Sequence, residues 1–562
     1  MDSRVTKPWN TESICNIAGA LAWQAARQPA TVAIHYPRKL SGRTTRFHAC
    51  NYRELNELSN AYAHGLAAQG ITAGTRTALM LHPGLDFVAV FFALFKAGAV
   101  PVLIDPGIGL PSLKQCLDEA APEVFIGVTR AQLARRWFGW AKASCKTFIT
   151  AGPSLGLGGI TLQRLQAAGT AAAGEDVLHP ARPDDMAAIL FTSGSTGLPK
   201  GVVYRHKQFA AQVELLQRAY GIEPGEVGLS TFPPFALFDP ALGITTVVPP
   251  MDPTRPARAN PEKLVKVIDQ FAVTNVFASP AVVDLISRHT EQRGNRMWSI
   301  KRVISAGAAV PPKVVRRLQQ ALAQDALIHT PYGATECLPV TTINHRQLDA
   351  KVESMTESGE GICVGWPIEP NQVRVIGMSE NAFADLSETT PMPPGMPGEI
   401  IVSGPSCSDR YWQRDGDTEL AKIADEKGNI WHRMGDIGVL DGRGCLWFCG
   451  RKAQRIETGQ ETLFAEQVEG IFNQHPDALR TALVGVGTPG RQIPVLCVEP
   501  VTKLAPVDRE RVHYDLLQLA QAHALTRSVR SVLFHPGFPV DIRHNSKINR
   551  DKLAQWAAGK IP

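Results

Sequence analysis

The chain has 562 residues, of which 44% are hydrophobic and 20% charged, a composition that excludes a disordered polypeptide. A single hydrophobic core stops growing near about 250–300 residues, so we expect at least two domains. The net charge of +6 is not gathered into a basic block, and therefore a nucleic-acid partner is not indicated.

The longest apolar stretch, residues 87–95, is far shorter than the roughly 20 residues of a membrane helix, so we expect no membrane span. Ten cysteines are scattered from Cys15 to Cys497, and the closest pair, Cys445 and Cys449, lacks the spacing of zinc or redox motifs. Residues 1–9 are polar and do not resemble a signal peptide. These features predict a cytoplasmic protein with free thiols.

Helices and strands alternate along the first third of the chain. Leu55, Leu58, Tyr62 and Leu66 recur at the spacing of one helical face, and Gly70 ends that helix. A strand, a helix and two further strands are then predicted over 77–81, 87–96, 100–104 and 124–128. Strands separated by helices favour right-handed crossovers and a mostly parallel sheet covered on both faces.

The same pattern returns in the strands predicted over 276–278 and 303–305. Residues 391–397 are rich in proline, which indicates an exposed connector. The last ~110 residues carry further helix and strand patterns, for example at 462–472 and 495–498, and could form a small separate α/β domain. The fold class expected is therefore α/β.

The most informative segment follows an apolar strand over 188–191. It consists of Thr192, Ser193, Gly194, Ser195, Thr196, Gly197, Leu198, Pro199, Lys200 and Gly201. Glycines let backbone N–H groups close around an anion, hydroxyl groups add donors, and Lys200 adds a mobile positive charge. The spacing differs from the P-loop, in which lysine directly follows the last glycine. We interpret it as a triphosphate loop of another kind, with a flexible Gly/Ser turn as the alternative.

This loop resembles the phosphate-binding signature of the acyl-adenylate-forming (AMP-binding) superfamily. The resemblance extends in order over nearly the whole chain, through segments 51–55, 96–101, 305–309, 332–336, 398–400, 433–436, 450–451 and 545–550. It implies a large N-terminal domain, residues 1–450, with parallel sheets flanked by helices. It also implies a small mobile C-terminal α/β domain, residues 451–562, that carries the catalytic lysine.

The resemblance also implies ATP and Mg²⁺ as cofactors and a role for each motif residue. A carboxylate attacks the α-phosphorus of ATP, and the charge that builds on the phosphates must be neutralised. Glu336 would hold Mg²⁺, Thr335 would donate to the α-phosphate, and Tyr332, beside Gly333, would stack on adenine. Ala306, Gly307 and Ala308 would line the adenine and acyl sites. The alternatives are a solvated Glu336 and a core Tyr332.

Three more residues complete the implied site. Asp436 would accept hydrogen bonds from the ribose hydroxyls, and Arg451 would reach the ribose or a phosphate. Lys547 would bridge the carboxylate and the α-phosphate as they approach, and as a charge donor in the transition state it would contribute roughly 10²–10³ in rate. A turn aspartate, a surface arginine and a solvated lysine are the alternatives.

Two positions depart from the superfamily pattern. Ala453 occupies the hinge position at which relatives usually carry aspartate or lysine, which weakens the transfer of a hinge role. Leu237 stands where many relatives have a histidine near the acyl pocket, within segment 233–240. That segment reads either as an unusual acyl gate or as a packed aromatic loop. His206 has a counterpart in the family and is interpreted as structural.

Segments 184–190, 204–215 and 233–248 look most like the olefin-biosynthesis β-lactone synthetase branch of the superfamily. That branch implies a 2-alkyl-3-hydroxy fatty acid whose own hydroxyl displaces AMP, and an assembly with other olefin-pathway enzymes. Phe232, Phe235 and Phe238 would line a long apolar pocket, with core packing as an equal alternative.

Two alternatives to a β-lactone synthetase stay open at this point. One is a fatty-acyl-CoA ligase that makes a thioester from the same adenylate. The other is a nucleotide-binding scaffold without catalysis, against which the presence of Lys200, Glu336, Asp436 and Lys547 argues. Chain length, stereochemical preference and oligomeric state do not follow from the sequence.

Overall fold

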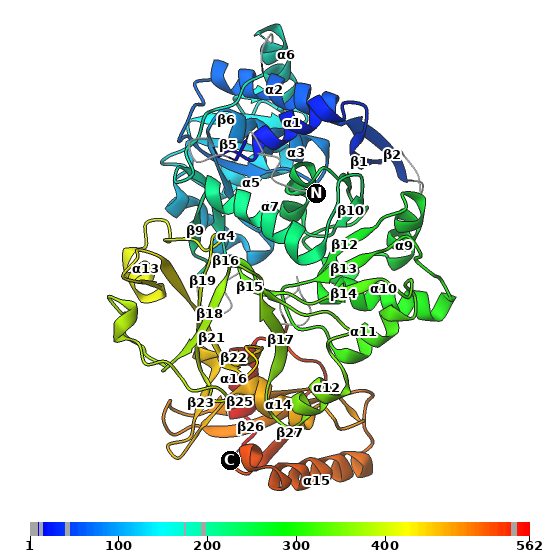
Figure 1. Ribbon diagram of the computed structural model, residues 1–562, viewed down its shortest axis with the longest axis vertical. Coiled ribbons are helices and arrows are strands. Elements are labelled where there is room, and N and C mark those ends of the chain that lie inside the picture. The colour runs from blue at the N-terminus through cyan, green and yellow to red at the C-terminus, as the bar shows by residue number, and fades with distance from the viewer. Residues whose placement is uncertain are drawn as a thin grey trace.

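The computed structural model describes residues 9–10, 15–39, 45–172, 176–192, 198–540 and 548–561. Within these ranges the chain forms two mostly parallel sheets, an antiparallel sheet and a small C-terminal α/β unit (Figure 1). The parallel sheets carry the first three fifths of the chain, and the C-terminal unit lies at the opposite end of the molecule.

The first sheet has the strand order β7-β6-β5-β3-β4-β8-β9, and only its edge pair β8/β9 is antiparallel. The strands are β3 (Arg76–Met80), β4 (Val100–Leu103), β5 (Val124–Val128), β6 (Thr147–Ala151), β7 (Ile160–Thr161), β8 (Met186–Phe191) and β9 (Gly201–Arg205). The helices around it are α1 (Ala18–Arg27), α2 (Tyr52–Ala68), α3 (Leu85–Lys96), η1 (Pro106–Ile108), α4 (Leu110–Ala120), α5 (Thr129–Phe138), α6 (Leu162–Ala172) and α7 (His206–Tyr220).

The second sheet has the order β14-β13-β12-β10-β11-β1-β2, with β1/β2 as its antiparallel edge. Its strands are β1 (Val32–Lys39), β2 (Thr45–Asn51), β10 (Val227–Ser230), β11 (Thr245–Val247), β12 (Asn275–Ala278), β13 (Arg302–Ser305) and β14 (Leu327–His329). Its helices are η2 (Pro233–Leu237), α8 (Asp239–Leu242), η3 (Pro256–Arg258), α9 (Pro261–Gln270), α10 (Pro280–Arg293) and α11 (Pro312–Gln319).

Helix α3 shows why the two sheets form one body. Its residues Phe87 to Lys96 are all buried, so it is apolar around its whole circumference rather than along one stripe. Phe95 packs against Phe209 of α7, with ring centroids 5.3 Å apart, and both belong to a hydrophobic core that also includes residues of the two sheets. The helices between the sheets therefore hold the carboxyl ends of the strands in fixed positions.

The antiparallel sheet was not predicted as a unit. It has the order β15-β16-β17-β22-β21-β19-β18, with β20 paired to β21. Its strands are β15 (Tyr332–Ala334), β16 (Cys337–Thr342), β17 (Ile362–Pro367), β18 (Gln372–Ile376), β19 (Gly398–Ser403), β20 (Lys422–Ala424), β21 (Ile430–Leu440) and β22 (Leu446–Arg451). The accompanying helices are α12 (Ala350–Glu357), η4 (Leu386–Glu388) and α13 (Asp415–Ala421).

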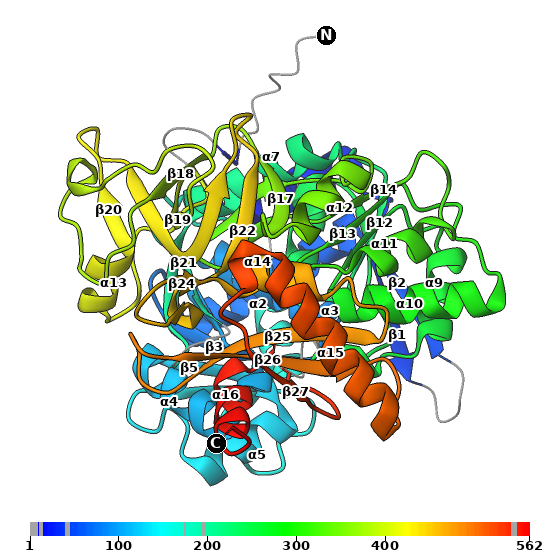
Figure 2. The same ribbon diagram turned by 90° about the horizontal axis from the view of Figure 1, so that it is seen from below.

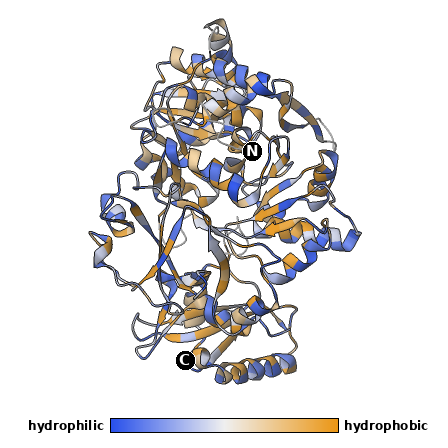
Figure 3. Cartoon of the chain, viewed as in Figure 1, coloured by the Kyte–Doolittle hydropathy of each residue, from blue (hydrophilic) through white to orange (hydrophobic). Residues whose placement is uncertain are grey.

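The C-terminal unit follows β22. It contains η5 (Lys452–Gln454), the hairpin β23 (Ile456–Glu457)/β24 (Thr462–Leu463), the sheet β25 (Ala478–Val486), β26 (Ile493–Pro500) and β27 (Ser531–Phe534), and the helices α14 (Ala465–Phe472), α15 (Pro506–Ala522), η6 (Ala524–Thr526) and α16 (Arg550–Ala558). Apolar residues concentrate on the sheet strands, whereas α15 is largely hydrophilic (Figure 3). The expected large N-terminal and small C-terminal domains are thus present. The exact boundary between them, at residues 450 and 451, stays a prediction.

The prediction of free thiols is wrong for two of the ten cysteines. Cys337, the first residue of β16, and Cys407, which follows β19, form a disulfide. The pair is 70 residues apart in the chain, so no local spacing could indicate it. The other eight cysteines are buried free thiols, as predicted. Among the described residues, no helix is both long and apolar enough to cross a membrane.

Candidate functional site

A large cavity, of about 2370 Å³, lies where the two parallel sheets meet the antiparallel sheet. Its walls include residues directly after strands of both parallel sheets, such as Thr192 after β8, Ser279 after β12 and Ala306 after β13. Ligands of α/β proteins bind in the crevice at the carboxyl ends of such strands. The cavity is therefore the candidate functional site.

The cavity brings together the predicted site residues that the structure describes. These are Thr192, Lys200, Ala306, Gly307, Ala308, Tyr332, Gly333, Thr335, Glu336, Asp436 and Arg451. The remaining ones, Ser193, Gly194, Ser195, Thr196, Gly197 and Lys547, lie outside the described residues. The individual roles assigned to all of them stay predictions.

Asp436 is the most constrained of these residues. It is paired with Arg451 across β21 and β22, and its Oδ1 lies 2.9 Å from an Arg451 guanidinium nitrogen. Its Oδ2 accepts a hydrogen bond of 2.7 Å from the phenol of Tyr332. Burial and the neighbouring carboxylate raise the pKa of Tyr332 well above its usual value, so the phenol stays a donor. Asp436 is therefore a hydrogen-bond acceptor that is fixed at the cavity wall.

Glu336 is held at both its backbone and its side chain by the 407–412 segment, which follows β19. The N–H of Ser408 donates to the Glu336 carbonyl at 2.7 Å, and the phenol of Tyr411 donates to Glu336 Oε1 at 2.8 Å. The Cys337–Cys407 disulfide joins the same two segments, through the residue after Glu336 and the residue before Ser408. These links fix the carboxylate at the cavity wall.

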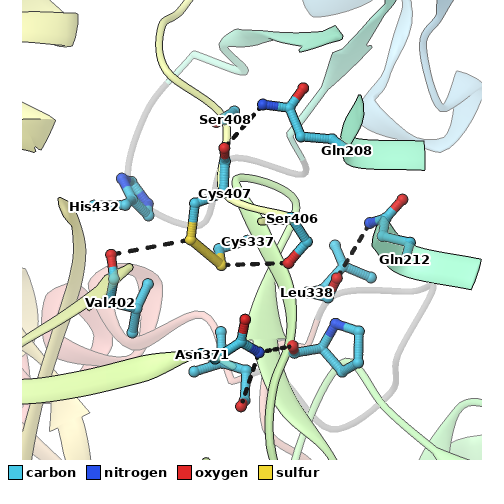
Figure 4. The surroundings of a disulfide bond; sticks show 12 residues. Gln208, Gln212, Cys337, Leu338, Asn371, Val402, Ser406, Cys407, Ser408 and His432 are labelled. Carbon is cyan, nitrogen blue, oxygen red and sulfur yellow. Dashed lines mark hydrogen bonds between the residues drawn. A yellow bond between two sulfur atoms is a disulfide. The ribbon is translucent and has the colours of Figure 1, made fainter. Parts of the chain in front are cut away.

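The 407–412 segment is itself anchored to β9 of the first parallel sheet and to α7, and Figure 4 shows the contact with Gln208 of α7. The side chain of Gln208 donates to the Cys407 carbonyl at 2.9 Å, and Arg205 forms a bidentate ion pair with Asp409. At its end, the Trp412 N–H donates to the Gly201 carbonyl at 2.7 Å. The segment thus connects Glu336 to the strand that directly follows Lys200.

Lys200 is not a free cation in this structure. Its ammonium group lies 2.6 Å from Asp417 Oδ1 and 5.0 Å from the centre of the Tyr411 ring. Asp417 is also paired with Arg414, which forms a bidentate ion pair with Glu119. Lys200, Tyr411 and Asp417 all line the cavity, so a phosphate entering it would compete with Asp417 for the ammonium group.

Lys422 is a buried lysine that the sequence did not single out. Its ammonium group donates to the Ser408 carbonyl at 2.6 Å and to the Ser408 hydroxyl at 3.0 Å, and it lies 5.8 Å from the Tyr411 ring centre. Burial lowers the pKa of Lys422 to about 8, although Glu336 and Asp409 oppose this shift. Burying an ammonium group is costly, and here its hydrogen bonds stabilise the residue that holds Glu336.

No sequence pattern could have found Lys422, Tyr411 or Asp417, because their positions follow from the pairing of distant segments. Lysine is almost always exposed, and only the packing of β20 beneath the 407–412 segment buries Lys422. The pair formed by Lys200 and Asp417 joins two positions far apart in the chain.

The side of the cavity beneath η2 is apolar. Phe232, Phe235, Leu237 and Phe238 line it, as does Phe277 of β12. Phe235 stacks on Phe277 with a centroid distance of 3.7 Å, and Phe238 lies 6.2 Å from Phe209 of α7. The phenylalanines therefore pack against one another and border the cavity at the same time, so the two readings of this segment do not exclude each other.

The donor set fits magnesium better than a metal caged by protein ligands. Among the described residues, no group of three or more His, Cys, Asp and Glu side chains could hold a metal ion. Glu336 offers one carboxylate, of which Oε1 accepts the hydrogen bond from Tyr411, and it lines the same cavity as Lys200 and Thr335. Magnesium bound to phosphates needs only one or two protein carboxylates.

Comparison with known proteins gives two kinds of similarity. The model of the "AMP-binding enzyme" family matches residues 21–412. The chain is 49% identical to an olefin β-lactone synthetase of Xanthomonas campestris pv. campestris, over 97% of this chain and 98% of that protein. It is 48% identical to an olefin β-lactone synthetase of Stenotrophomonas maltophilia, over 97% and 99% of the two chains.

Among solved structures, an amide bond synthetase from Marinactinospora thermotolerans superposes with a TM-score of 0.77. The alignment has 21% sequence identity and covers 96% of this chain and 99% of the other. An anthranilate CoA ligase in complex with anthranoyl-AMP also gives a TM-score of 0.77, at 17% identity over 98% and 99% of the chains. At these identities the likeness concerns the fold, with its large N-terminal and small C-terminal domains.

Proposed function

The chain belongs to the AMP-binding enzyme family, and we propose that it activates a 2-alkyl-3-hydroxy fatty acid with ATP and closes it to a β-lactone. The observation that carries this proposal is its identity of nearly one half, over almost its full length, with two olefin β-lactone synthetases. Eleven of the predicted site residues line one cavity. This arrangement supports the first step of the reaction, the adenylation of the acid.

In the first step a carboxylate oxygen of the acid attacks the α-phosphorus of ATP, and pyrophosphate leaves. Lys200 and Lys547 supply positive charge, and Thr335 supplies a hydroxyl donor, where negative charge builds on the phosphates. Asp436 accepts hydrogen bonds from the ribose, with Arg451 and Tyr332 holding it in place. Glu336 would hold Mg²⁺, which supplies charge neutralisation at the phosphates when bound.

In the second step the 3-hydroxyl oxygen of the same substrate attacks the acyl carbonyl carbon. The bond from that carbon to the AMP oxygen breaks, AMP leaves, and the hydroxyl proton is released. Holding the hydroxyl beside the carbonyl makes this step unimolecular, which offsets part of the strain of a four-membered ring. The apolar wall formed by Phe232, Phe235 and Phe238 would take alkyl chains, at about 0.8 kcal/mol per buried CH₂.

Adenylation is tested by exchange of labelled pyrophosphate into ATP. We expect exchange that depends on a 2-alkyl-3-hydroxy acid and on Mg²⁺, because the first step is reversible. An acid with the same chains but no 3-hydroxyl should still support exchange while giving no lactone. Absence of acid-dependent exchange in the purified protein would instead favour a scaffold without catalysis. Association with other olefin-pathway enzymes, which the family resemblance implied, stays a prediction.

A substitution of Lys422 tests whether the support of Glu336 matters for this reaction. Lys422→Met keeps the length of the side chain but removes the hydrogen bonds to Ser408, and we expect pyrophosphate exchange to fall about tenfold. The Mg²⁺ concentration needed for half-maximal nucleotide binding, measured by calorimetry, should rise, because Glu336 loses part of its anchoring.

Lys96→Met is the matched control for this variant. Lys96 is also buried, but its ammonium group donates to Asn56 and Asn60 on α2 and not to the 407–412 segment that holds Glu336. Its replacement should leave the Mg²⁺ dependence unchanged. If the Lys422→Met variant binds nucleotide with the wild-type Mg²⁺ dependence, or with a lower Mg²⁺ requirement, Lys422 does not position Glu336.

A further inference from the structure

Helix α5 carries an exposed group of apolar and cationic side chains that the proposed reaction does not use. Trp137 is 86% exposed, Leu133 45% and Phe138 41%. Arg130, Leu133 and Trp137 follow the three- and four-residue spacing of one helical face, and Arg136 and Lys142 are exposed beside them. We call these six residues the α5 patch. Single exposed apolar side chains are common on protein surfaces, whereas a group of large ones marks a contact surface.

The charge of this region has one sign. Residues 129–146 contain five basic residues and no aspartate or glutamate. Arg135 is turned inward over the Phe148 ring, 3.7 Å from its centre, so the outward cations are the remaining four. A carboxylate next to the segment, Asp118, pairs with Lys114 and accepts a hydrogen bond from the Ala141 N–H. The α5 patch therefore presents aromatic and aliphatic side chains among cations.

One residue of the α5 patch, Arg130, also lines the cavity. Val128, Arg130 and Ala131, at the start of α5, line the cavity, and so does Leu110 of the neighbouring helix α4, which is 48% exposed. Figure 2 shows α4 and α5 at the outer edge of the molecule. A surface in contact with the α5 patch would thus lie beside exposed residues of the wall of the cavity that is proposed to take alkyl chains.

We propose that the α5 patch binds the surface of an anionic lipid bilayer, from which the two-chain substrate enters the cavity. Tryptophan is the side chain best suited to the boundary between water and lipid, and arginine and lysine beside it are attracted to anionic headgroups. A protein partner with a matching acidic surface is less favoured, because the exposed side chains most prominent here are aliphatic and aromatic. The link to the substrate rests on the proposed function, whereas lipid binding itself requires neither ATP nor acid.

The test is sedimentation of the purified full chain with vesicles, in the absence of ATP and substrate. Vesicles of phosphatidylcholine are compared with vesicles in which about one third of the lipid is phosphatidylglycerol. We expect binding to the anionic vesicles, weakening as salt is raised, and at least tenfold weaker binding to phosphatidylcholine. The double variants Leu133→Ser/Trp137→Ser and Arg136→Gln/Lys142→Gln should each reduce binding to the anionic vesicles about tenfold or more.

Trp298→Ser is the matched control. Trp298 is 67% exposed with Arg296 beside its ring, but it follows α10, which carries Asp284 and Glu291, and it does not line the cavity. This variant should bind vesicles as the wild type does. All variants should keep wild-type thermal unfolding and wild-type pyrophosphate exchange with a short-chain acid that is soluble in water.

Three results would overturn the proposal. The first is wild-type protein that stays in solution with both kinds of vesicle. The second is vesicle binding that the α5 variants retain, or that the Trp298→Ser variant loses to the same extent as the α5 variants. The third is a concentration-dependent dimer that Leu133→Ser/Trp137→Ser abolishes, which would assign the α5 patch to a second copy of the chain. If vesicle binding fails while acid-dependent exchange is present, the proposed function stands without this surface.

Discussion

Replacing Lys547 by alanine is expected to reduce acid-dependent pyrophosphate exchange by about 10²–10³-fold. The side chain would supply positive charge where the carboxylate and the α-phosphate approach, and this charge contributes in the transition state more than in the bound ATP complex. ATP affinity, measured by calorimetry, should therefore change much less than exchange. This division between rate and binding distinguishes a catalytic lysine from one that merely attracts the nucleotide.

Lys552→Ala is the control for that variant. Lys552 lies exposed in the first turn of α16, five residues further along the chain, so its removal changes the net charge of the region equally. Exchange in this variant should be close to that of the wild type. Normal exchange in the Lys547→Ala variant, or equal losses in both variants, would remove Lys547 from the mechanism.

The second large effect is expected at Asp436. In the Asp436→Asn variant the carboxylate that faces Tyr332 and Arg451 becomes a neutral amide of the same shape. Hydrogen bonds to a charged group contribute about 1.5–3 kcal/mol each, so losing the charge opposite the ribose should weaken ATP binding by roughly 10²-fold. Calorimetric titration with ATP measures this directly.

Tyr332→Phe is the comparison for Asp436. It removes the phenol that donates to Asp436 but leaves the carboxylate and its pairing with Arg451, so the expected loss of ATP affinity is about tenfold or less. Unchanged ATP affinity in the Asp436→Asn variant, with normal thermal unfolding, would contradict the assignment of Asp436 to the ribose.

The parallel part of the fold could be predicted from the sequence because its elements are local and strongly apolar. The strand predicted over 124–128 is β5 residue for residue, and the helix predicted over 87–96 is α3 without its first two residues. The helix that begins at Tyr52 has a complete capping box formed by Asn51 and Glu54. In each case the pattern within a short window determines the element.

The antiparallel sheet could not be predicted in the same way. Strand β17 pairs with β22, more than 80 residues away, so no short window of the sequence contains both partners. The Cys337–Cys407 disulfide and the burial of Lys422 depend on the same long-range pairing. The motif residues of the site were found because the family resemblance named them, whereas Tyr411, Asp417 and Lys422, which support Glu336 and Lys200, carry no motif.

In the proposed reaction the substrate's own hydroxyl, and no external thiol, accepts the acyl group. The most direct measurement incubates the protein with ATP, Mg²⁺ and a 2-alkyl-3-hydroxy fatty acid, with and without coenzyme A, and identifies the product by mass spectrometry. We expect a β-lactone and AMP to form at the same rate in both reactions. A product that forms only with coenzyme A, and is its thioester, would exclude attack by the substrate's hydroxyl and identify a fatty-acyl-CoA ligase.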